Sequence, residues 1–302
     1  MNPRTETRTR STLGFVDATF TKTRRELTTP QGVLRYHEAG PDDPGAPPLI
    51  LLHGSGPGVT GWRNYRGNLA FFARTHRCYV IEFPGFGVSD PVEGHPVLSA
   101  GSSVIRFMDA LDIERSAIIG NSMGGVVGVN LAIKKPDRVD RLVTIGGVGP
   151  NVFSPSPSEG LRLLQEFTDA PDRDKLVRWL NSMVFDRALV TDELIEERWE
   201  AAIHPDAQRT AQMMYGSLAF DMAQQFMAAS DTPPYWSMMH KISCPTLLTW
   251  GRDDRVSPPD MAMVPMRLIP DAQLHVFPNC GHWVMIEAKT EFEKVVAAFL
   301  SR

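Results

Sequence analysis

Short runs of consecutive apolar residues recur along the chain, and most of them are closely followed by glycine. These runs lie at 49–52, 78–81, 117–120, 142–145 and 246–250, with a weaker one at 274–277. Strands that are apolar on both faces are typical of a parallel sheet covered by helices on both sides. Helix-length amphipathic segments such as 100–111 and 123–135 lie between the runs. The pattern predicts an α/β fold with a doubly wound, mostly parallel sheet.

Two changes in this pattern predict how the chain is organised. Residues 18–35 alternate in polarity around a turn sequence at 29–32, which predicts a β-hairpin before the first buried strand. From Pro150 to about Lys241 the strand pattern disappears, and helical periodicity replaces it at 161–167, 174–183, 192–202 and 207–227. We therefore expect a helical cap, 151–241, inserted between two strands of a core formed by 26–150 and 242–302. Such a cap would cover the carboxyl edge of the sheet, where open α/β sheets bind ligands.

Composition and charge exclude several function classes. Of 302 residues, 42% are hydrophobic, and 31 Lys and Arg stand against 35 Asp and Glu, for a net charge of -4. No apolar stretch is long enough to span a membrane, and the charge supplies no broad positive field, so we expect neither a nucleic-acid partner nor a membrane partner.

The cysteines and the N-terminal segment carry two further expectations. Cys78, Cys244 and Cys280 are odd in number and far apart, without metal-binding spacing, which favours a reducing cytoplasm over a disulfide framework or a zinc site. Residues 1–25 contain six basic and two acidic side chains. We expect this segment to be a solvated basic arm.

A first motif with chemical meaning follows the apolar run at 117–120. Residues 120–124 (GNSMG) match the pattern G-x-S-x-G and lie between a predicted strand and a predicted helix. Small residues allow a sharp strand-to-helix turn, which would hold the Ser122 hydroxyl above the sheet at the N-terminus of the helix. Ser122 is therefore the candidate nucleophile.

A glycine-rich segment, 53–58 (HGSGPG), follows the first buried run. Acyl chemistry needs N–H donors that face the developing oxyanion, and a glycine-rich loop can present them without obstruction by side chains. We assign the oxyanion hole to the backbone N–H groups of Met123 and Ser55, with Gly54 or Gly56 as the alternative second donor. A phosphate-binding loop is disfavoured, because neither Gly-Lys-Ser/Thr nor G-x-G-x-x-G is present.

An acid and a histidine complete the chain order Ser, acid, His. Residues 251–254 (GRDD) follow the run at 246–250, and His282 follows the last predicted strand. A histidine base takes the proton of the nucleophile, while a carboxylate fixes its tautomer. Spacing alone does not distinguish Asp253 from Asp254 as that carboxylate. The ordered set predicts a serine-dependent α/β-hydrolase.

Four segments resemble the meta-cleavage product hydrolases, C–C bond hydrolases of the α/β-hydrolase superfamily that act in bacterial degradation of aromatic compounds. They are 53–65 (HGSGPGVTGWRNY), 120–125 (GNSMGG), 250–254 (WGRDD) and 280–283 (CGHW). In the predicted cap, 186–200 (DRALVTDELIEERWE) is similar to the same family. The resemblance spans about residues 30–300.

The resemblance implies a role for each matching residue. Ser122 would be the nucleophile, His282 the base and Asp254 its orienting acid. The pocket for the dienoate end of a small-molecule substrate would be lined by Asn64, Asn121, Arg198, Trp283, Gly54 and Gly56. The resemblance also implies a homodimer or a higher homo-oligomer, and a reaction that needs no metal and no organic cofactor.

Arg198 also has a physical argument of its own. A guanidinium can hold a carboxylate through two parallel hydrogen bonds. Without the resemblance, the alternative would be a solvated charge that pairs with glutamates at helical spacing in the segment 196–198.

The sequence departs from the family pattern at two positions. Glu82 stands where Asp is more familiar, and Met183 stands where an aromatic residue is frequent. These departures leave the identity of the distal substrate group open.

The reaction implied by the resemblance is hydrolysis of a C–C bond in a vinylogous 1,5-diketone, a ring-fission product of the 2-hydroxy-6-oxo-dienoate type. Two alternatives stay open. One is a carboxylesterase or lactonase that uses the same triad on a C–O bond, and the other is a non-catalytic receptor with the same fold. Arg198 separates the first alternative from C–C hydrolysis, and the reactivity of Ser122 separates the second.

Overall fold

The structure, a computed structural model, describes residues 18–43, 45–229 and 233–302. Residues 1–17, which make up most of the predicted basic arm, lie outside the described residues. The described part of that arm forms the short helix α1 (Phe20–Thr23) and the first two residues of strand β1 (Arg24–Thr29). Thr23 Oγ1 lies 2.9 Å from His37 Nδ1, and this hydrogen bond ties α1 to the neighbouring strand.

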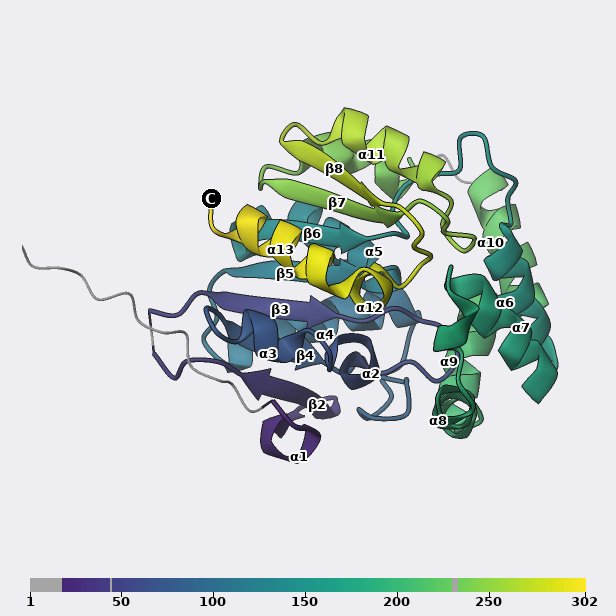
Figure 1. Ribbon diagram of the computed structural model, residues 1–302, viewed down its shortest axis with the longest axis horizontal. Helices are drawn as coiled ribbons and strands as arrows, with labels where there is room; N and C mark the ends of the chain where they lie inside the picture. The colour runs from purple at the N-terminus through teal and green to yellow at the C-terminus, as the bar shows by residue number, and fades with distance from the viewer. Residues whose placement is uncertain (1–17, 44, 230–232) are drawn as a thin grey trace, which may run out of the picture.

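An eight-stranded sheet runs through the molecule in the order β1-β2-β4-β3-β5-β6-β7-β8 (Figure 1). The strands after β1 are β2 (Gly32–Ala39), β3 (Pro48–Leu52), β4 (Arg77–Ile81), β5 (Ser116–Asn121), β6 (Val139–Ile145), β7 (Thr246–Gly251) and β8 (Ala272–Phe277). β2 pairs antiparallel with β1 and with β4, whereas all the other pairings are parallel. The predicted hairpin and the predicted mostly parallel sheet are confirmed. β8 is only partly buried, because an edge strand has a neighbour on one side alone.

Helices cover both faces of the sheet, because successive strand residues point to opposite sides. Leu49 and Leu51 pack on the side covered by α2 (Gly61–Tyr65), α3 (Leu69–Phe72), α12 (Val284–Glu287) and α13 (Lys289–Leu300). Ile50 and Leu52 pack on the side covered by α4 (Pro96–Ala110) and α5 (Met123–Lys134), and α11 (Met263–Leu268) lies on that side too. Continuous apolar runs are therefore required, since both faces of each central strand are buried.

Among the described residues, five further α-helices lie between β6 and β7, and Figure 1 shows them grouped beyond the end of the sheet to which β3 points. They are α6 (Glu159–Asp169), α7 (Arg173–Met183), α8 (Asp192–Ala202), α9 (Pro205–Tyr215) and α10 (Ser217–Ala229). Side-chain caps begin four of them: the Ser158 hydroxyl accepts from Leu161 N, the Asp172 carboxylate from Lys175 N, the Thr191 hydroxyl from Leu194 N, and His204 Nδ1 from Asp206 N.

The prediction of one helix over 207–227 is wrong. The chain leaves the helical conformation at Gly216, where ψ is 147°, so α9 ends at Tyr215 and α10 begins at Ser217. Ser217 N donates to the Asp169 carboxylate at 2.9 Å, which anchors the junction to α6. A tertiary contact thus divides a segment whose local periodicity is continuous.

Two glycines in neighbouring helices should respond in opposite ways to alanine. A Cβ on Gly124 would lie 2.3 Å from the carbonyl oxygen of Leu52, whereas a Cβ on Gly101 in α4 would meet nothing within 4 Å. We expect Gly124→Ala to lower the free energy of unfolding by at least about 3 kcal/mol. Gly101→Ala should raise it by about 0.5–1 kcal/mol, since alanine restricts the unfolded chain. Urea unfolding of both variants measures this, and equal effects would contradict the packing described.

Candidate active site

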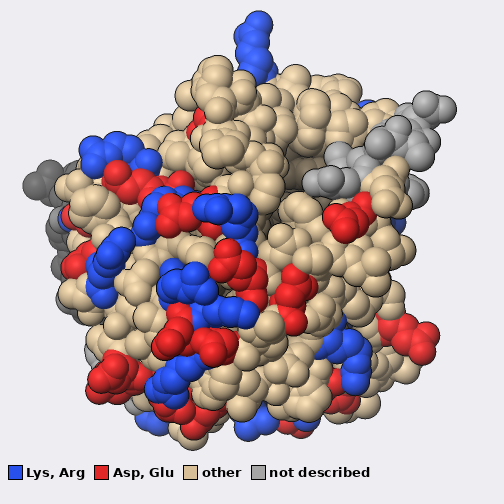
Figure 2. All heavy atoms as spheres, turned by 90° about the vertical axis from the view of Figure 1, so that its right-hand side faces the viewer, with Lys and Arg blue, Asp and Glu red and all other residues tan. Residues whose placement is uncertain are grey.

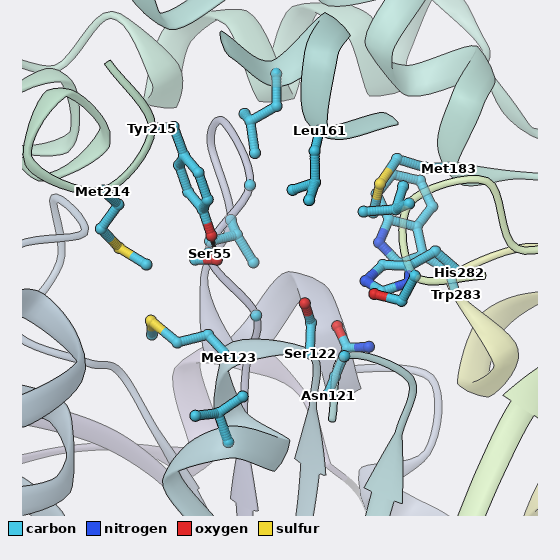
Figure 3. A pocket seen from close by; sticks show the side chains of 18 of the residues that line it. Ser55, Asn121, Ser122, Met123, Leu161, Met183, Met214, Tyr215, His282 and Trp283 are labelled. Carbon is cyan, nitrogen blue, oxygen red and sulfur yellow. Dashed lines mark hydrogen bonds between the residues drawn. The ribbon is translucent and has the colours of Figure 1, made fainter. Parts of the chain in front are cut away.

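Ser122 stands at the turn between β5 and α5 in a strained backbone conformation. Its φ is 51° and its ψ is -114°, a combination that costs about 1–3 kcal/mol for a residue with a Cβ. Ser122 N donates to Ile145 O at 2.9 Å, and Gly147 leaves the space that the turn needs, because a Cβ there would lie 2.5 Å from Ser122 Cα. The turn directs the Ser122 side chain into a cavity beneath the cap (Figure 3).

His282 and Asp254 form a buried pair beside this cavity. His282 Nδ1 lies 2.7 Å from Asp254 Oδ2, and the two residues are 2% and 4% exposed. Asp254 Oδ1 accepts hydrogen bonds from Val256 N and Ser257 N, both at 2.8 Å, so the carboxylate orientation is held by backbone donors. With its Nδ1 proton held by Asp254, the imidazole presents Nε2 as its free acceptor.

Only one of the two candidate aspartates contacts the histidine. Asp253 Oδ2 lies 3.2 Å from an Arg252 guanidinium nitrogen, whereas Asp254 lies against His282. Ser122 and His282 line the same cavity, and among the described residues no hydrogen bond joins them. Contacts between nucleophile and base are often long without substrate and tighten when it binds.

The loop 54–58 lies between the Ser122 turn and the cap. Gly54 packs against the turn, since a Cβ on it would lie 3.4 Å from Ser122 Cβ. Gly56 packs under the Trp179 ring, where a Cβ would lie 2.3 Å from the nearest carbon, and Gly58 packs against the Arg198 backbone, with a φ of 64°. Ser55, which lies between Gly54 and Gly56, lines the cavity together with Met123. Met123 N begins α5 and belongs to the first turn, whose N–H groups have no partner within the helix.

His53 anchors the start of this loop. Its Nδ1 lies 2.6 Å from Gly54 O and its Nε2 accepts from Phe83 N at 2.9 Å, so the ring is neutral, with the proton on Nδ1. Burial lowers the pKa of His53 to about 4. The loop that carries Ser55 is therefore held by a histidine that must stay uncharged.

His53 should make the stability of the protein depend on pH. In the unfolded chain, His53 binds a proton below about pH 6.5, whereas in the folded chain it stays neutral until the pH falls to about 4. The stabilisation is complete above pH 6.5 and is lost as the pH falls toward 4. The loss from this group between pH 7 and pH 5 is about 2 kcal/mol. Urea unfolding at the two pH values measures the fall in the free energy of unfolding from pH 7 to pH 5. This fall should be smaller by that amount in His53→Gln than in the wild type. An identical fall in both proteins would contradict the assignment.

Arg198, from α8, is a buried cation with no acidic partner among the described residues. It is 2% exposed, its Nε makes no hydrogen bond, and one terminal nitrogen donates to Pro57 O at 3.3 Å. The guanidinium carbon lies 4.9 Å from the centre of the Trp283 ring. Burial, reinforced by the charge of Arg63, lowers the pKa of Arg198 to about 9, so the group remains charged at neutral pH.

The glutamates next to Arg198 in sequence are engaged elsewhere. The Glu197 carboxylate lies 3.0 Å from Arg63 Nε and accepts two hydrogen bonds from Arg66, at 3.0 and 3.1 Å. Glu196 pairs with Arg173 at 2.6 Å. The helical pairing considered as the alternative for Arg198 is therefore not what the structure shows.

Two buried asparagines lie near Arg198 and the nucleophile. Asn64 Nδ2 donates to Asn121 Oδ1 at 3.0 Å, and Asn121 Nδ2 donates to Ile145 O at 3.2 Å. Asn64 Oδ1 is buried without a hydrogen-bond partner. Asn64 belongs to α2, whose first N–H groups donate to the carboxylate of Glu82, from Gly61 at 2.6 Å and from Trp62 at 2.8 Å. The unusual Glu82 thus fixes the helix that carries Asn64.

The residues named above meet in one cavity of about 230 Å³. It is lined by Ser122, His282, Ser55, Met123, Asn64, Asn121, Arg198, Trp283, Gly54 and Gly56, and by apolar residues from the core and the cap. In Figure 3, Met123 and Met214 lie on the opposite side of Ser122 from Trp283. All the predicted site residues except Asp254 therefore line a single cavity, and Asp254 lies behind His282.

Among the lining residues that sequence reasoning did not assign to the site are Trp179, Met214 and Tyr215. Trp179 Nε1 is buried without a hydrogen-bond partner, and the Tyr215 hydroxyl bonds to the Ser55 hydroxyl. The local signal of these residues is ordinary helical periodicity, which does not say which face of a helix meets a cavity. Met183, which departs from the family pattern, does line the cavity.

Neither positive nor negative charge predominates on the outer surface of the cap. Figure 2 shows acidic and basic side chains interleaved on this face. Among the described residues, no group of three or more His, Cys, Asp and Glu side chains is placed to hold a metal ion. In the same part of the chain, no helix is both long and apolar enough to cross a membrane.

Comparison with known proteins places the chain in a family. A model of the alpha/beta hydrolase fold family matches residues 47–289. A 2-hydroxy-6-oxononadienedioate/2-hydroxy-6-oxononatrienedioate hydrolase of Comamonas testosteroni is 38% identical, covering 84% of this chain and 87% of that protein. A 2-hydroxy-6-oxo-6-phenylhexa-2,4-dienoate hydrolase of Burkholderia cepacia is 38% identical with the same coverage. The solved structure of a meta-cleavage product hydrolase from Pseudomonas fluorescens IP01 has a TM-score of 0.80 at 31% identity, over 93% of this chain and 98% of that one. The chain therefore belongs to the meta-cleavage product hydrolases, the C–C bond hydrolases of the α/β-hydrolase fold family.

Proposed function

We propose that the protein hydrolyses the C–C bond next to the distal ketone of a 2-hydroxy-6-oxo-dienoate, with Ser122 as nucleophile, His282 as base and Asp254 as the acid that orients it. The observation that carries the proposal is the buried, charged Arg198, which has no acid partner among the described residues. An unpaired buried charge is costly, so its presence in a cavity beside a nucleophile indicates a ligand that supplies the opposite charge.

The carboxylate end of the substrate would lie between Arg198 and the two asparagines. The Arg198 guanidinium, with its free Nε, offers a bidentate site for a carboxylate, and Trp283 forms an apolar wall beside it. Asn64 Oδ1, buried and unpartnered, can accept a hydrogen bond from the 2-hydroxyl group. Gly54 and Gly56 supply backbone without side chains, so the substrate chain can pass close to the loop.

The order of steps follows from the leaving group, which is carbon. The dienol first ketonises while Arg198 and the asparagines hold its end, which creates an electron sink. His282 then takes the Ser122 proton, and Oγ attacks the distal ketone, whose oxyanion accepts from the N–H groups of Ser55 and Met123. The C–C bond breaks as its electron pair moves into the ketonised fragment, which gains a proton and leaves as a 2-hydroxydienoate. Water activated by His282 finally hydrolyses the acyl-Ser122 ester and releases a carboxylic acid.

The distal end of the cavity favours an uncharged substituent on the ketone. On the side of Ser122 away from Trp283, Figure 3 shows Met123, Met214 and Tyr215, with Ser55 beside them. The cavity lining also includes the apolar residues Val97, Val126, Leu161 and Leu164. Arg198 is the single cation among the described residues that line the cavity. A second carboxylate at the distal end would be buried without a cationic partner, at a cost of several kcal/mol. A phenyl or alkyl group would be buried favourably there.

A panel of ring-fission products tests the proposal, with loss of the dienolate chromophore as the signal. We expect kcat/KM for a 6-phenyl or 6-alkyl dienoate to exceed that for the matching dicarboxylate by at least about 100-fold. Neutral esters in the same panel serve as the comparison for C–O cleavage. Turnover of esters without any cleavage of dienoates would overturn the proposal, and preference for the dicarboxylate would overturn the assignment of the distal end.

The assembly and location of the enzyme are also proposals. Its small-molecule substrate requires no macromolecular partner, and family resemblance supports a homodimer or a higher homo-oligomer. Three buried free thiols, Cys78, Cys244 and Cys280, are suited to a reducing cytoplasm. Light scattering in solution measures the oligomeric state, and a monomer would overturn that part of the proposal.

A further inference from the structure

Tyr215 connects the cap to the loop that carries Ser55. It is the last residue of α9, it is half-buried, and its hydroxyl forms a hydrogen bond with Ser55 Oγ inside the cavity (Figure 3). Ser55 itself is buried, and among the described residues Tyr215 is the one partner of its hydroxyl. The sequence motifs assign neither side-chain hydroxyl a role.

The direction of this hydrogen bond follows from the acidity of the two groups. A phenol is a stronger acid than an aliphatic alcohol, so the Tyr215 O–H donates and Ser55 Oγ accepts. Burial raises the pKa of Tyr215, which keeps its proton in place at neutral pH. The proton of the Ser55 hydroxyl is then free to turn toward the cavity. Ser55 could thus present two donors to the reacting carbonyl, its backbone N–H and its hydroxyl.

The position of Tyr215 is fixed from the cap. The backbone turns sharply at Gly216, whose N–H donates to Gln212 O at 3.2 Å. The next residue, Ser217, is held by Asp169 of α6 at 2.9 Å. On the other side, the loop 54–58 is held by His53 and by the packing of Gly54 against the Ser122 turn. The hydroxyl pair therefore joins two structures that are each anchored separately.

We propose that Tyr215 is a positioning residue for acyl transfer, which acts through Ser55 by directing the Ser55 hydroxyl and its backbone N–H toward the oxyanion of the distal ketone. The proposal rests on the oxyanion hole of the proposed function. It predicts that loss of the tyrosine hydroxyl slows attack by Ser122 without weakening the binding of the carboxylate end, because Arg198 and the asparagines are untouched.

Transient kinetics of Tyr215→Phe on a 6-phenyl dienoate tests this prediction. We expect the rate of C–C cleavage to fall by about 10-fold, the effect of one neutral hydrogen bond, while substrate binding and ketonisation keep their wild-type rates. Ser55→Ala, which keeps the backbone N–H, should have an effect of the same size. The double variant should be no slower than the slower single variant, whereas independent roles would multiply to about 100-fold and overturn the proposal.

A second readout does not depend on the identity of the substrate. A fluorophosphonate probe reacts with an activated serine and places its phosphoryl oxygen in the oxyanion hole, so the rate of Ser122 labelling should fall in Tyr215→Phe by a similar factor. This fall would support the proposal even if no dienoate were cleaved. Labelling at the wild-type rate would overturn it, whatever the result with the dienoate.

Tyr235→Phe is the matched control. Tyr235 is also half-buried and follows the cap helices, but its hydroxyl accepts from Gly149 N at 3.1 Å and does not line the cavity. Labelling and cleavage by this variant should match the wild type. Thermal unfolding of both tyrosine variants checks that the fold is retained.

Discussion

Replacement of Ser122 by alanine is expected to lower kcat on a ring-fission product by at least about 10⁴-fold, the largest loss among the variants considered. The covalent route requires the Ser122 oxygen, and among the described residues no other hydroxyl stands on a strained turn beside the His282–Asp254 pair. Substrate binding should persist, since Arg198, Asn64 and Trp283 are unchanged. Steady-state cleavage and a spectroscopic titration of the dienolate measure the two effects separately.

The control for this variant is Ser103→Ala, a buried serine in α4 whose hydroxyl bonds to Ala100 O within its own helix. It should keep wild-type activity and wild-type labelling. If the Ser122 variant kept a tenth of the activity, the nucleophilic role would have to be abandoned. Failure of the wild-type protein to react with the phosphonate probe at Ser122 would instead favour the non-catalytic receptor.

The second large effect is expected for Arg198→Ala. On a dienoate, kcat/KM should fall by about 10²- to 10³-fold, because the substrate carboxylate would enter the cavity without its partner. On a neutral ester of similar size, the change should be less than about 3-fold, since no charge needs compensation. The ratio of the two losses is the informative quantity. Equal losses on both substrates would contradict the assignment of Arg198 to the carboxylate and favour the esterase or lactonase alternative.

Arg66→Ala provides the matched control for Arg198. Arg66 carries the same charge and lies near the same end of the site, but its side chain is 47% exposed and paired with Glu197. Its loss should change kcat/KM on either substrate by less than about 3-fold, because exposed ion pairs contribute little. A large effect of this substitution would mean that general positive charge near Arg198, rather than the buried guanidinium itself, selects the substrate.

Tertiary contacts explain where the sequence prediction of the fold was incomplete. The apolar runs at 49–52 and 246–250 are local signals of burial on both faces, and both form strands with a neighbouring strand on each side. The single helix predicted over 207–227 is instead two, because Gly216 turns the chain and Asp169 of α6 anchors the next residue. Local periodicity carries no information about a contact with a residue almost fifty positions away.

By itself, the sequence determined the parts of this protein that depend on neighbouring residues. The G-x-S-x-G pattern dictates the turn at Ser122, because only small residues fit where the backbone approaches so closely, and the apolar runs dictate a sheet buried on both sides. Only the tertiary structure shows that Asp254, which spacing could not distinguish from Asp253, contacts His282. It also shows that the glutamates beside Arg198 bind other arginines and that Tyr215 reaches Ser55. These contacts join side chains that are far apart in the sequence, and they depend on how the cap packs over the sheet.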